Sequence, residues 1–525
     1  MRKKSLQLSL RYFIAFILIA LNISVYPQSA PKILWQECLG DSLFNSPYAI
    51  KQTFDNGYIL VGYTESGFLG KRNAIIFKLD FLGRIQWEKI LGGSYSDYFF
   101  NVEQTRDSGY IAVGSTESND GDVHNAHGLF DVWVVKFDKN GKTEWENTFG
   151  GSSDELGWDI HQTKDGGCVI AAKTQSNNDQ VSGNHSISTD YGDFWLFKID
   201  SEGKLLWQKC YGGKWEEWPY SMQLTNDGGY IMAGYSTSND GDVSGHHGLT
   251  NSADCWIVKI DSNRNIQWQK SFGGSAELDQ AEKIYQTGDG GYIVGAQAYS
   301  MDGDITNNHG PTDFWLLKLK SDGSIEWQKC YGGSKNDDLF ALYPTLDGGY
   351  IAAGRTTSSD GDVKEISKFQ DVWVIKVNSD NSIKWQNTFG GSDAEHALSI
   401  IQNKDSSYIF TGETLSTDGD IKDNHGFYDI WVVKLDKDSI KPATLSLLCQ
   451  KIYPDPARNF VYVPNLTQQN NYSIVIYDVL GRRVYIKENI VGDTQIDCSR
   501  LASGLYFISE LSAHFRHTCK LIKIN

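Results

Sequence analysis

The chain has 525 residues, of which 40% are hydrophobic, 13% are aromatic and 52 are glycine. This length exceeds a single compact core, and beyond the N-terminus no apolar run is long enough to span a bilayer, which excludes an integral membrane protein. Residues 1–30 carry four basic groups and residues 441–525 carry ten basic and six acidic groups, so the net charge of −17 leaves −25 on the residues between them. Such a charge repels phosphates and anionic membranes, which excludes nucleic acid as a partner.

The first segment has the features of a secretory signal peptide. Four basic residues, the last of them Arg11, precede the apolar stretch Tyr12–Val25 and a small-residue site at Ser29 and Ala30. An anchoring helix is the alternative, but the stretch is short for a membrane span. No cysteine follows it directly, which argues against a lipoprotein anchor. We therefore expect residues 1–30 to be removed and the mature chain to carry no transmembrane anchor.

From Trp35 to Asp436 one pattern recurs seven times at a spacing of about 60 residues, a period typical of β-propellers. The copy that begins at Trp207 reads WQKCYGG, then TNDGGYIMAGYSTSNDGDV, then DCWIVKID. Each copy contains four strand-like segments, which is the content of one blade. The sequence predicts an all-β chain with a seven-bladed propeller of four-stranded blades over residues 31–440. The first tryptophan of the pattern stands at Trp35, Trp87, Trp145, Trp207, Trp268, Trp327 and Trp385.

Details of the repeat predict how the blades are built. The segment Val132–Asp138 is apolar on both faces, as expected of a strand covered by a blade on each side. The triplet of Asp227, Gly228 and Gly229 supplies positive φ for a tight hairpin between the first two strands. The chain starts with a spare tryptophan strand, Ile33–Leu39, and the seventh copy lacks one. We therefore expect the N-terminal strand to complete blade seven and close the ring.

The stretch from Asp138 to Trp145 has the pattern D-x-x-G-x-x-x-W, which resembles the tryptophan-docking repeat of quinoprotein-type propellers. The resemblance implies that packing motif and no quinone cofactor, because the further cofactor residues have no counterpart in this sequence. The DGGY and DGD elements as a whole are similar to propellers of Bacteroidetes-type surface proteins.

The cysteine positions do not indicate a disulfide framework. Cys38, Cys210 and Cys330 occupy one repeat position in blades that are not neighbours, so ring symmetry keeps them apart. We predict buried free thiols in the propeller, while a bridge between Cys498 and Cys519 stays open.

A DGD motif recurs in five of the copies. Two carboxylates around a glycine are able to supply oxygen ligands to calcium, the one cofactor for which the sequence offers ligands. The alternative is a long hairpin turn whose aspartates accept backbone N–H groups, and the missing further acids of an EF-hand loop favour it. The aspartates are Asp120, Asp122, Asp240, Asp242, Asp302, Asp304, Asp360, Asp362, Asp418 and Asp420.

Histidines and acids also recur at fixed places. One histidine per blade is too dispersed for a zinc site, so we expect the histidines to form local hydrogen bonds. The acids after the Gly-Gly pair either form a ring at one mouth of the central channel or cap turn amides. The histidines are His127, His185, His247, His309 and His425, and the acids are Asp97, Glu155, Glu217, Asp279, Asp337 and Glu395.

The fourth copy departs from the pattern after its Gly-Gly pair, where Trp215 and Trp218 fit no repeat position. Two surplus tryptophans beside carboxylates predict a ligand-binding, sugar-stacking platform made of Trp215, Glu216, Glu217 and Trp218. The alternative is that the tryptophans fill a gap between blades. Trp158 aligns with aromatic residues of other copies, and we assign it to the core.

After residue 446 a different module begins, with the landmarks IYPDPARN, YDVLGRRV, LASGLYFI and CKLIKIN. Over residues 446–525 these landmarks resemble the type A sorting domain of the type IX secretion system, and the alternating segments predict a small β-sandwich. The resemblance implies periplasmic transit, export across the outer membrane of a diderm bacterium by the secretion machinery, and cleavage by a sortase, which leaves the passenger secreted or at the surface. The sorting-signal residues are Pro454, Pro456, Gly481, Arg482, Gly504, Tyr506, Lys520 and Lys523.

The sequence assigns no catalytic residue, because it contains no G-x-S-x-G, H-E-x-x-H or phosphate-binding loop. We expect a secreted or surface propeller that binds a glycan or a surface protein through loops at one face. Two alternatives stay open: a polysaccharide-acting enzyme with clustered carboxylates, and a structural surface protein without a small ligand.

Overall fold

The computed structural model describes residues 29–66, 70–248, 252–276, 278–364, 366, 369–438, 459–463, 472–478, 482–511 and 516–523. These residues form two compact units, one within Met1–Ser439 and one within Ile440–Asn525. Their regular elements are all β-strands. Within the described ranges, no helix has the length and apolar character needed to cross a membrane.

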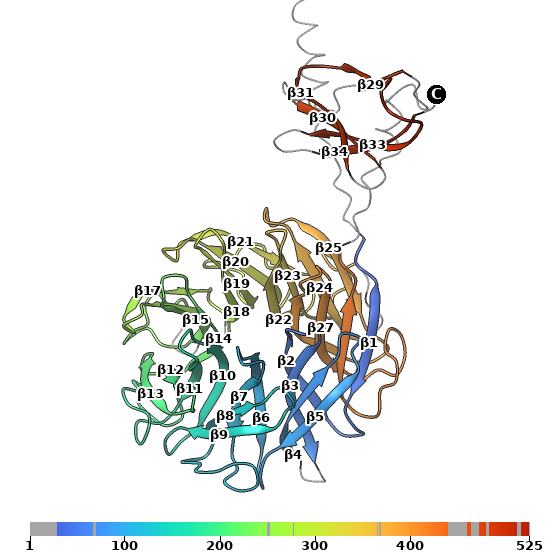
Figure 1. The fold of residues 1–525 in the computed structure, drawn as a ribbon. Helices are drawn as coiled ribbons and strands as arrows, with labels where there is room; N and C mark the ends of the chain where they lie inside the picture. Colours follow the sequence, from blue (N-terminus) through green and yellow to red (C-terminus); the bar gives the residue numbers. More distant parts are fainter. Residues whose placement is uncertain are drawn as a thin grey trace, which may run out of the picture. The chain divides into compact units, whose positions relative to one another are not determined.

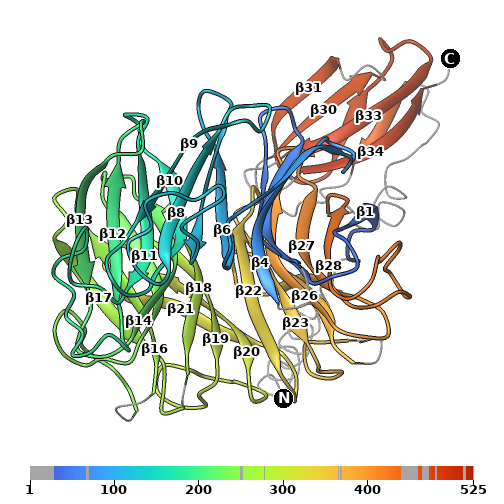
Figure 2. The same cartoon turned by 90° about the horizontal axis from the view of Figure 1, so that it is seen from below.

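The first unit is a ring of seven four-stranded antiparallel sheets around one axis (Figures 1 and 2). The first strand of each blade contacts the first strands of its neighbours and is therefore the innermost. This architecture confirms the predicted all-β, seven-bladed propeller.

The strands follow one another outward from the axis in each blade. Blade one contains β2 (Asn45–Gln52), β3 (Tyr58–Ser66), β4 (Lys71–Leu79) and β5 (Ile85–Leu91), and blade two contains β6 (Asp97–Gln104), β7 (Tyr110–Thr116), β8 (Asp131–Phe137) and β9 (Thr143–Phe149). Blade three contains β10 (Glu155–Gln162), β11 (Cys168–Thr174), β12 (Asp193–Ile199) and β13 (Leu205–Tyr211), and blade four contains β14 (Glu217–Leu224), β15 (Tyr230–Ser236), β16 (Asp254–Ile260) and β17 (Ile266–Phe272). Blade five contains β18 (Gln280–Gln286), β19 (Tyr292–Ala298), β20 (Asp313–Leu319) and β21 (Ile325–Tyr331), and blade six contains β22 (Asp337–Pro344), β23 (Tyr350–Thr356), β24 (Asp371–Val377) and β25 (Ile383–Phe389). Blade seven contains β26 (Glu395–Gln402), β27 (Tyr408–Thr414), β28 (Asp429–Leu435) and, from the other end of the chain, β1 (Ile33–Leu39).

The N-terminal strand closes the ring as predicted. Strand β1 pairs antiparallel with β28, with Cys38 opposite Trp431, and the N–H of Asp436 donates to the carbonyl of Lys32 at 2.9 Å. The closure joins the two ends of the propeller chain in one sheet, so β28 is paired on both sides and β1 becomes the outermost strand of blade seven.

The third strand of each blade is buried on both faces, as its apolar sequence predicts. All seven residues of β8 are buried, and Trp133 is completely inaccessible to solvent. Its indole N–H donates to Glu146 on the outermost strand at 3.0 Å, which satisfies the one polar atom of the ring. The same bond joins Trp195 to Gln208, Trp256 to Gln269, Trp315 to Gln328, Trp373 to Gln386 and Trp431 to Gln36.

The outermost tryptophans dock onto the neighbouring blade. A Cβ on Gly141, which has a φ of 81°, would lie only 2.8 Å from the indole of Trp87, so the ring packs directly on the glycine. Trp268 packs in the same way on Gly323, and its indole N–H donates to the carbonyl of Ser321 at 3.0 Å. The D-x-x-G-x-x-x-W pattern is therefore an interblade packing motif.

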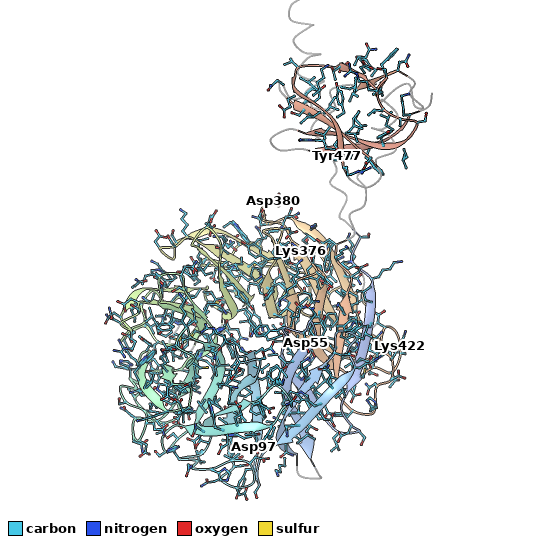
Figure 3. The ribbon with its side chains drawn as sticks, viewed as in Figure 1. Asp55, Asp97, Lys376, Asp380, Lys422 and Tyr477 are labelled. Carbon is cyan, nitrogen blue, oxygen red and sulfur yellow. The ribbon has the colours of Figure 1, made fainter. Side chains whose placement is uncertain are left out.

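The DGG hairpins combine a turn with an ion pair. Gly228 has a φ of 80°, as the predicted hairpin requires, and Asp227 accepts from the ammonium of Lys259 on the third strand at 2.8 Å. In blade six the corresponding Lys376 is buried among the strands, whereas Asp380 lies at the rim (Figure 3). The repeated lysine of the third strand thus neutralises the turn aspartate.

The second unit consists of two small sheets that share one core. Strand β29 (Phe460–Val463) pairs with β32 (Thr494–Asp497), and the other sheet has the order β31 (Arg483–Ile490), β30 (Tyr472–Asp478), β33 (Gly504–Leu511) and β34 (Arg516–Lys523). Val461 and Ile496 from the first sheet pack with Ile474 and Leu521 from the second, as in a sandwich.

Free thiols occupy the cores of both units. Within the described residues Cys38, Cys168, Cys210, Cys255, Cys330 and Cys498 are all buried and free. This confirms the prediction that the cysteines of the propeller are buried free thiols. Cys498 is also free, so it does not form a disulfide bond.

Candidate functional site in the central channel

A β-bulge shapes the innermost strand of every blade. In blade one Pro47 pairs with Gly62 and Ala49 with Val61, so the residue between them, Tyr48, has no partner on β3. A Cβ on Gly62 would lie 1.9 Å from the carbonyl oxygen of Ser46, which explains the glycine in the second strand of most copies. The bulge adds one residue to the strand and redirects its side chain. The bulged residues of the seven blades are Tyr48, Phe100, Trp158, Tyr220, Glu282, Phe340 and Leu398.

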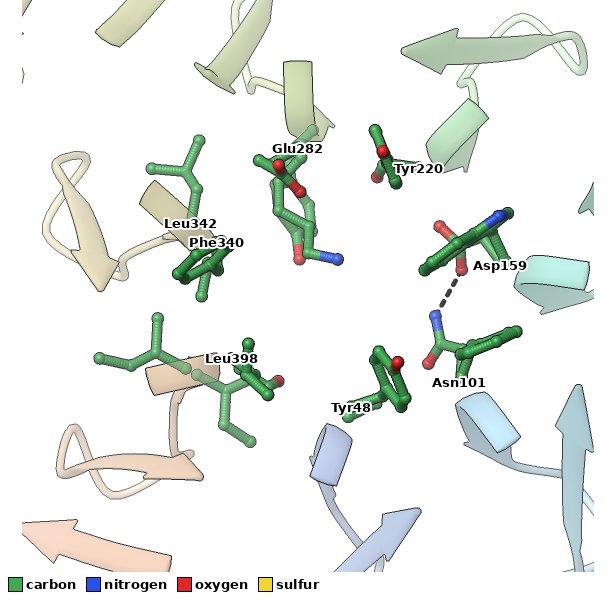
Figure 4. Close-up of a pocket in the computed structure, with 18 of the residues that line it drawn as sticks. Tyr48, Asn101, Asp159, Tyr220, Glu282, Phe340, Leu342 and Leu398 are labelled. Carbon is green, nitrogen blue, oxygen red and sulfur yellow. Dashed lines mark hydrogen bonds between the residues drawn. The ribbon is translucent and has the colours of Figure 1, made fainter. Parts of the chain in front are cut away.

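These bulged residues line a cavity of about 300 Å³ on the propeller axis (Figure 4). Five of the seven are aromatic, and the rings of Tyr48, Phe100, Trp158 and Tyr220 form a continuous arc. The ring centroids of Tyr48 and Phe100 are 4.7 Å apart, those of Phe100 and Trp158 are 4.5 Å apart, and those of Trp158 and Tyr220 are 5.2 Å apart. The cavity therefore presents aromatic faces and edges to whatever enters it.

A polar network adjoins the aromatic arc. The side-chain amide of Asn101 donates to Asp159 at 2.6 Å (Figure 4), and the N–H of Met222 donates to the other carboxylate oxygen at 2.8 Å. The ring of His161 bonds to Glu103 at 2.6 Å and to the carbonyl of Met222 at 2.8 Å. Burial lowers the pKa of His161, but the two carboxylates outweigh burial and raise the pKa to about 9. His161 is therefore a cation at neutral pH, already held by Glu103.

Blade five places two charged groups, Glu282 and Lys283, next to each other in the cavity wall. Glu282 accepts hydrogen bonds from the side-chain amides of Gln280 at 2.6 Å and Gln297 at 3.0 Å, and burial raises its pKa to about 7. The next residue, Lys283, and Lys51 of blade one also line the cavity. Burial lowers the pKa of Lys283.

The two tryptophans singled out in blade four belong to different clusters. Trp218 lies beside the aromatic arc, with its ring 6.2 Å from that of Trp158 and 6.3 Å from that of Tyr220. Trp215 instead packs edge-on against Tyr191 at 5.3 Å. Both occupy regular repeat positions, which corrects the expectation that they fit none. The N–H of Trp215 donates to Ser238 just as that of Tyr95 donates to Ser118.

The two glutamates between them are occupied by the protein itself. Glu216 forms an ion pair with Lys173, whose ammonium lies 4.0 Å from the ring centroid of Trp218. Glu217 is completely buried and accepts from the hydroxyl of Ser236 at 2.6 Å and the N–H of Gly213 at 2.8 Å. The other recurring acids are equally buried and cap the same turn, so they do not ring the channel mouth. Their contacts are those of Asp97, Glu155, Asp279, Asp337 and Glu395 with the second glycine of each pair.

The DGD aspartates hold the Gly-Gly turn in place. Asp302 accepts from the N–H of Ser275 at 2.7 Å, and Asp304 from the N–H of Gly273 at 3.4 Å. No group of three or more metal-ligating side chains occurs in the described residues. These contacts support the turn interpretation. The same backbone N–H contact with the first aspartate of the motif recurs for Ser94 with Asp120, Lys214 with Asp240, Ser334 with Asp360 and Ser392 with Asp418. The contact with the second aspartate recurs for Gly92 with Asp122, Gly212 with Asp242 and Gly390 with Asp420. In the remaining loop the N–H of Asp362 donates to the carbonyl of Gly332.

The loop histidines form local bonds, as expected. The ring of His309 lies 2.6 Å from the carboxylate of Asp313, which also accepts the N–H of His309. His185, His247 and His425 repeat the ring contact with Asp193, Asp254 and Asp429, and His127 lies 3.7 Å from Asp131.

The structure describes some of the sorting-signal residues, and these lie in or next to the strands of the second unit. Arg482 pairs with Asp478 at 2.7 Å, and the hydroxyl of Tyr506 donates to the carbonyl of Ala502 at 3.0 Å. Gly504 begins β33, Lys520 and Lys523 lie in β34, and Pro454, Pro456 and Gly481 lie outside the described residues.

Sequence reasoning missed most of the channel site. Trp158 was assigned to the core but lines the cavity, and Lys51, Asp159, Glu282 and Lys283 were not singled out. A signal was present in the second strand, where most copies carry the glycine that the bulge requires. Only the structure shows that the bulged residue faces the axis.

Comparison with known proteins identifies the C-terminal unit. Residues 451–524 match the secretion system C-terminal sorting domain family. No curated protein matches the chain. Similar solved structures include PorZ, described as an essential surface component of the type-IX secretion system of Porphyromonas gingivalis, with 10% identity and a TM-score of 0.27 over 96% of this chain and 88% of that one. Sqt1 from Chaetomium thermophilum has 11% identity and a TM-score of 0.39 over 76% and 100%, and puromycin hydrolase has 11% and 0.43 over 95% and 63%. The chain thus joins a seven-bladed β-propeller to a type IX secretion sorting domain, which directs it to the cell surface or the extracellular space.

Proposed function

We propose that the exported propeller is a glycan-binding module and that its site is the axial cavity. The observation that carries the proposal is the arc of aromatic rings from Tyr48 to Tyr220 beside the polar network of Asn101 and Asp159. Aromatic faces bind the apolar faces of sugar rings, and fixed polar groups orient the hydroxyls.

The size of the cavity favours the end of a saccharide over the middle of a long polymer. Its volume of about 300 Å³ is at the lower limit of small-molecule sites. Trp218, with Glu216 and Lys173 beside it, extends the aromatic surface from Trp158 and Tyr220. Trp215 and Glu217 are not part of the proposed site, because the first packs on Tyr191 and the second is buried.

Binding of the chain from residue 31 to 525 to a panel of oligosaccharides tests the proposal. We expect Trp158→Ala to abolish binding, because it removes the centre of the arc, whereas the matched variant Trp215→Ala should bind as the native protein does. Binding that survives Trp158→Ala, or is lost equally in both variants, contradicts a site in the channel. No binding to any saccharide favours a protein ligand.

A polysaccharide-acting enzyme is the second candidate, and one observation favours it. Glu282 and Asp159 line the same cavity, and the pKa of Glu282 is raised to about 7, which suits a general acid at neutral pH. Product analysis of each bound saccharide tests this candidate, with Glu282→Gln as the variant that should bind but not cleave. Intact saccharides after prolonged incubation would exclude it.

A further inference from the structure

The carboxylates that line the cavity already have hydrogen-bond partners in the protein, whereas its lysines have none among the described residues. Both carboxylates that line it are occupied: Asp159 accepts from Asn101, from Met222 and from the N–H of Ile160, and Glu282 accepts from two glutamine amides. The acceptors of the cavity wall are thus largely satisfied by the protein.

The cations that line the cavity are not satisfied in this way. The ammonium groups of Lys51 and Lys283 form no hydrogen bond and no ion pair within 4 Å with any described residue. His161 is the third cation nearby, but Glu103 already pairs with it. The carboxylates of Asp159 and Glu282 act on Lys283 only at longer range. The free capacity of the cavity therefore includes two charged donors.

Both lysine side chains are partly exposed, so their ammonium groups can meet a ligand that enters the cavity, and a bound anion would supply the acceptor that the protein does not. The rest of the repeat region carries a large negative charge, so two free lysines on the axis are not a general property of this surface. Charge-assisted bonds to carboxylate, sulfate or phosphate are among the strongest that lysine forms.

We propose that the axial cavity selects acidic saccharides, with Lys283 and Lys51 binding the anionic substituent while the aromatic arc stacks on the sugar ring. This inference rests on the proposed function and names the chemical class of its ligand. A carboxylate on a uronic acid and a sulfate ester share the required chemistry.

Three probes of similar size distinguish these sources: tetragalacturonate, its neutral methyl ester, and a sulfated galactan tetrasaccharide. We expect the native chain from residue 31 to 525 to bind at least one acidic probe about tenfold more tightly than the ester, with an affinity that falls as salt rises. The acidic probe that binds better identifies the substituent.

The variant Lys283→Met tests the assigned contact, since it keeps most of the length of the side chain and removes the ammonium group. It should reduce acidic-probe affinity to that of the ester, and Lys51→Met should act in the same direction. Lys335→Met, at an exposed position between β21 and β22, is the matched control and should change nothing. The melting temperature of each variant establishes that it is folded.

The outcomes separate the two proposals. Equal binding of acid and ester, or unchanged acid preference in Lys283→Met, overturns the inference and leaves the glycan site standing. Absence of binding by every saccharide overturns the proposed function. In that case inorganic sulfate is the remaining probe. If sulfate stabilises the native chain more than it stabilises Lys283→Met, the result supports an anion site that does not require a sugar. If it stabilises both proteins equally, the anion site is overturned.

Discussion

Asp131 and Glu155 present their carboxyl groups to each other across Gly150, at the junction between blades two and three. A Cβ on Gly150 would lie 2.1 Å from Oδ1 of Asp131 and 2.5 Å from Oε2 of Glu155. Both side chains are completely buried, and Oδ1 of Asp131 has no hydrogen-bond partner among the described residues. Burial, with the charge of Asp131 as a further cause, raises the pKa of Glu155 to about 7. The same arrangement recurs for Asp193 with Glu217, Asp254 with Asp279, Asp313 with Asp337 and Asp371 with Glu395.

These pairs predict that the propeller loses stability as the pH rises from 5 to 9. Burial raises the pKa of Glu155 from 4.5 to about 7 and that of Asp337 from 3.8 to about 6. A raised carboxyl pKa gives stability that is complete below the unfolded-state value and is lost as the pH rises through the folded-state value. The protonated His161, with its pKa of about 9, acts in the same direction. The melting temperature should fall over this range, and Glu155→Gln should make the slope smaller. A flat profile would contradict the raised pKa values of these buried carboxyl groups.

The buried indole bonds predict a graded response to substitution in the third strand. Trp315→Phe should lower the free energy of unfolding by about 1 to 3 kcal/mol, because it leaves the amide of Gln328 without its partner. Trp315→Ala should lower it by about 3 to 5 kcal/mol through the cavity it creates. Urea unfolding measures both. Trp215→Ala is the control, and a loss there as large as in Trp315→Ala would refute the ranking.

Closure by the N-terminal strand predicts that removing residues 31–39 opens the ring. Strand β28 would then expose its edge, so we expect a lower melting temperature and self-association through strand pairing. Size-exclusion chromatography and thermal unfolding measure these effects. A matched control removes residues 446–525 and leaves β1 in place. A monomeric, equally stable protein without residues 31–39 would show that the closure contributes nothing.

The contacts of the DGD loops predict that calcium chelators do not change the stability of the propeller. Since the first aspartates accept N–H groups of the Gly-Gly turn, we expect the melting temperature to be the same with EDTA as with added calcium. Asp302→Ala should instead cost about 1 to 2 kcal/mol, because it leaves the N–H of Ser275 unpaired. A melting temperature that drops with EDTA and recovers with calcium would support the metal interpretation instead.

The sorting domain predicts the fate of a truncated chain. Without residues 446–525 the protein should accumulate in the periplasm, because the signal read by the secretion machinery is absent. Protease accessibility on intact cells measures the difference from the full chain. The double variant Gly504→Ala with Tyr506→Ala is a smaller change of the same signal. Surface display of the truncated chain would contradict the role assigned to residues 451–524.

The sequence predicted the roles of some residues correctly and those of others incorrectly. Trp133, Gly228 and strand β1 were assigned correctly, because their roles follow from a repeated local pattern. Trp158 was assigned to the core and Trp218 to no repeat position, because the bulge that orients the innermost strand has no sequence mark in the strand itself. Its mark is a glycine on the next strand.

The sequence by itself determined the number of blades, the closure of the ring and the export signal, since each depends on residues close together in the chain or on seven copies of one pattern. The tertiary structure decided the site. Residues such as Lys51, Trp158 and Lys283 come from different blades and meet only at the axis. Which of them pair with each other and which remain free to bind depends on distances across the channel, and these arise only when the ring is closed.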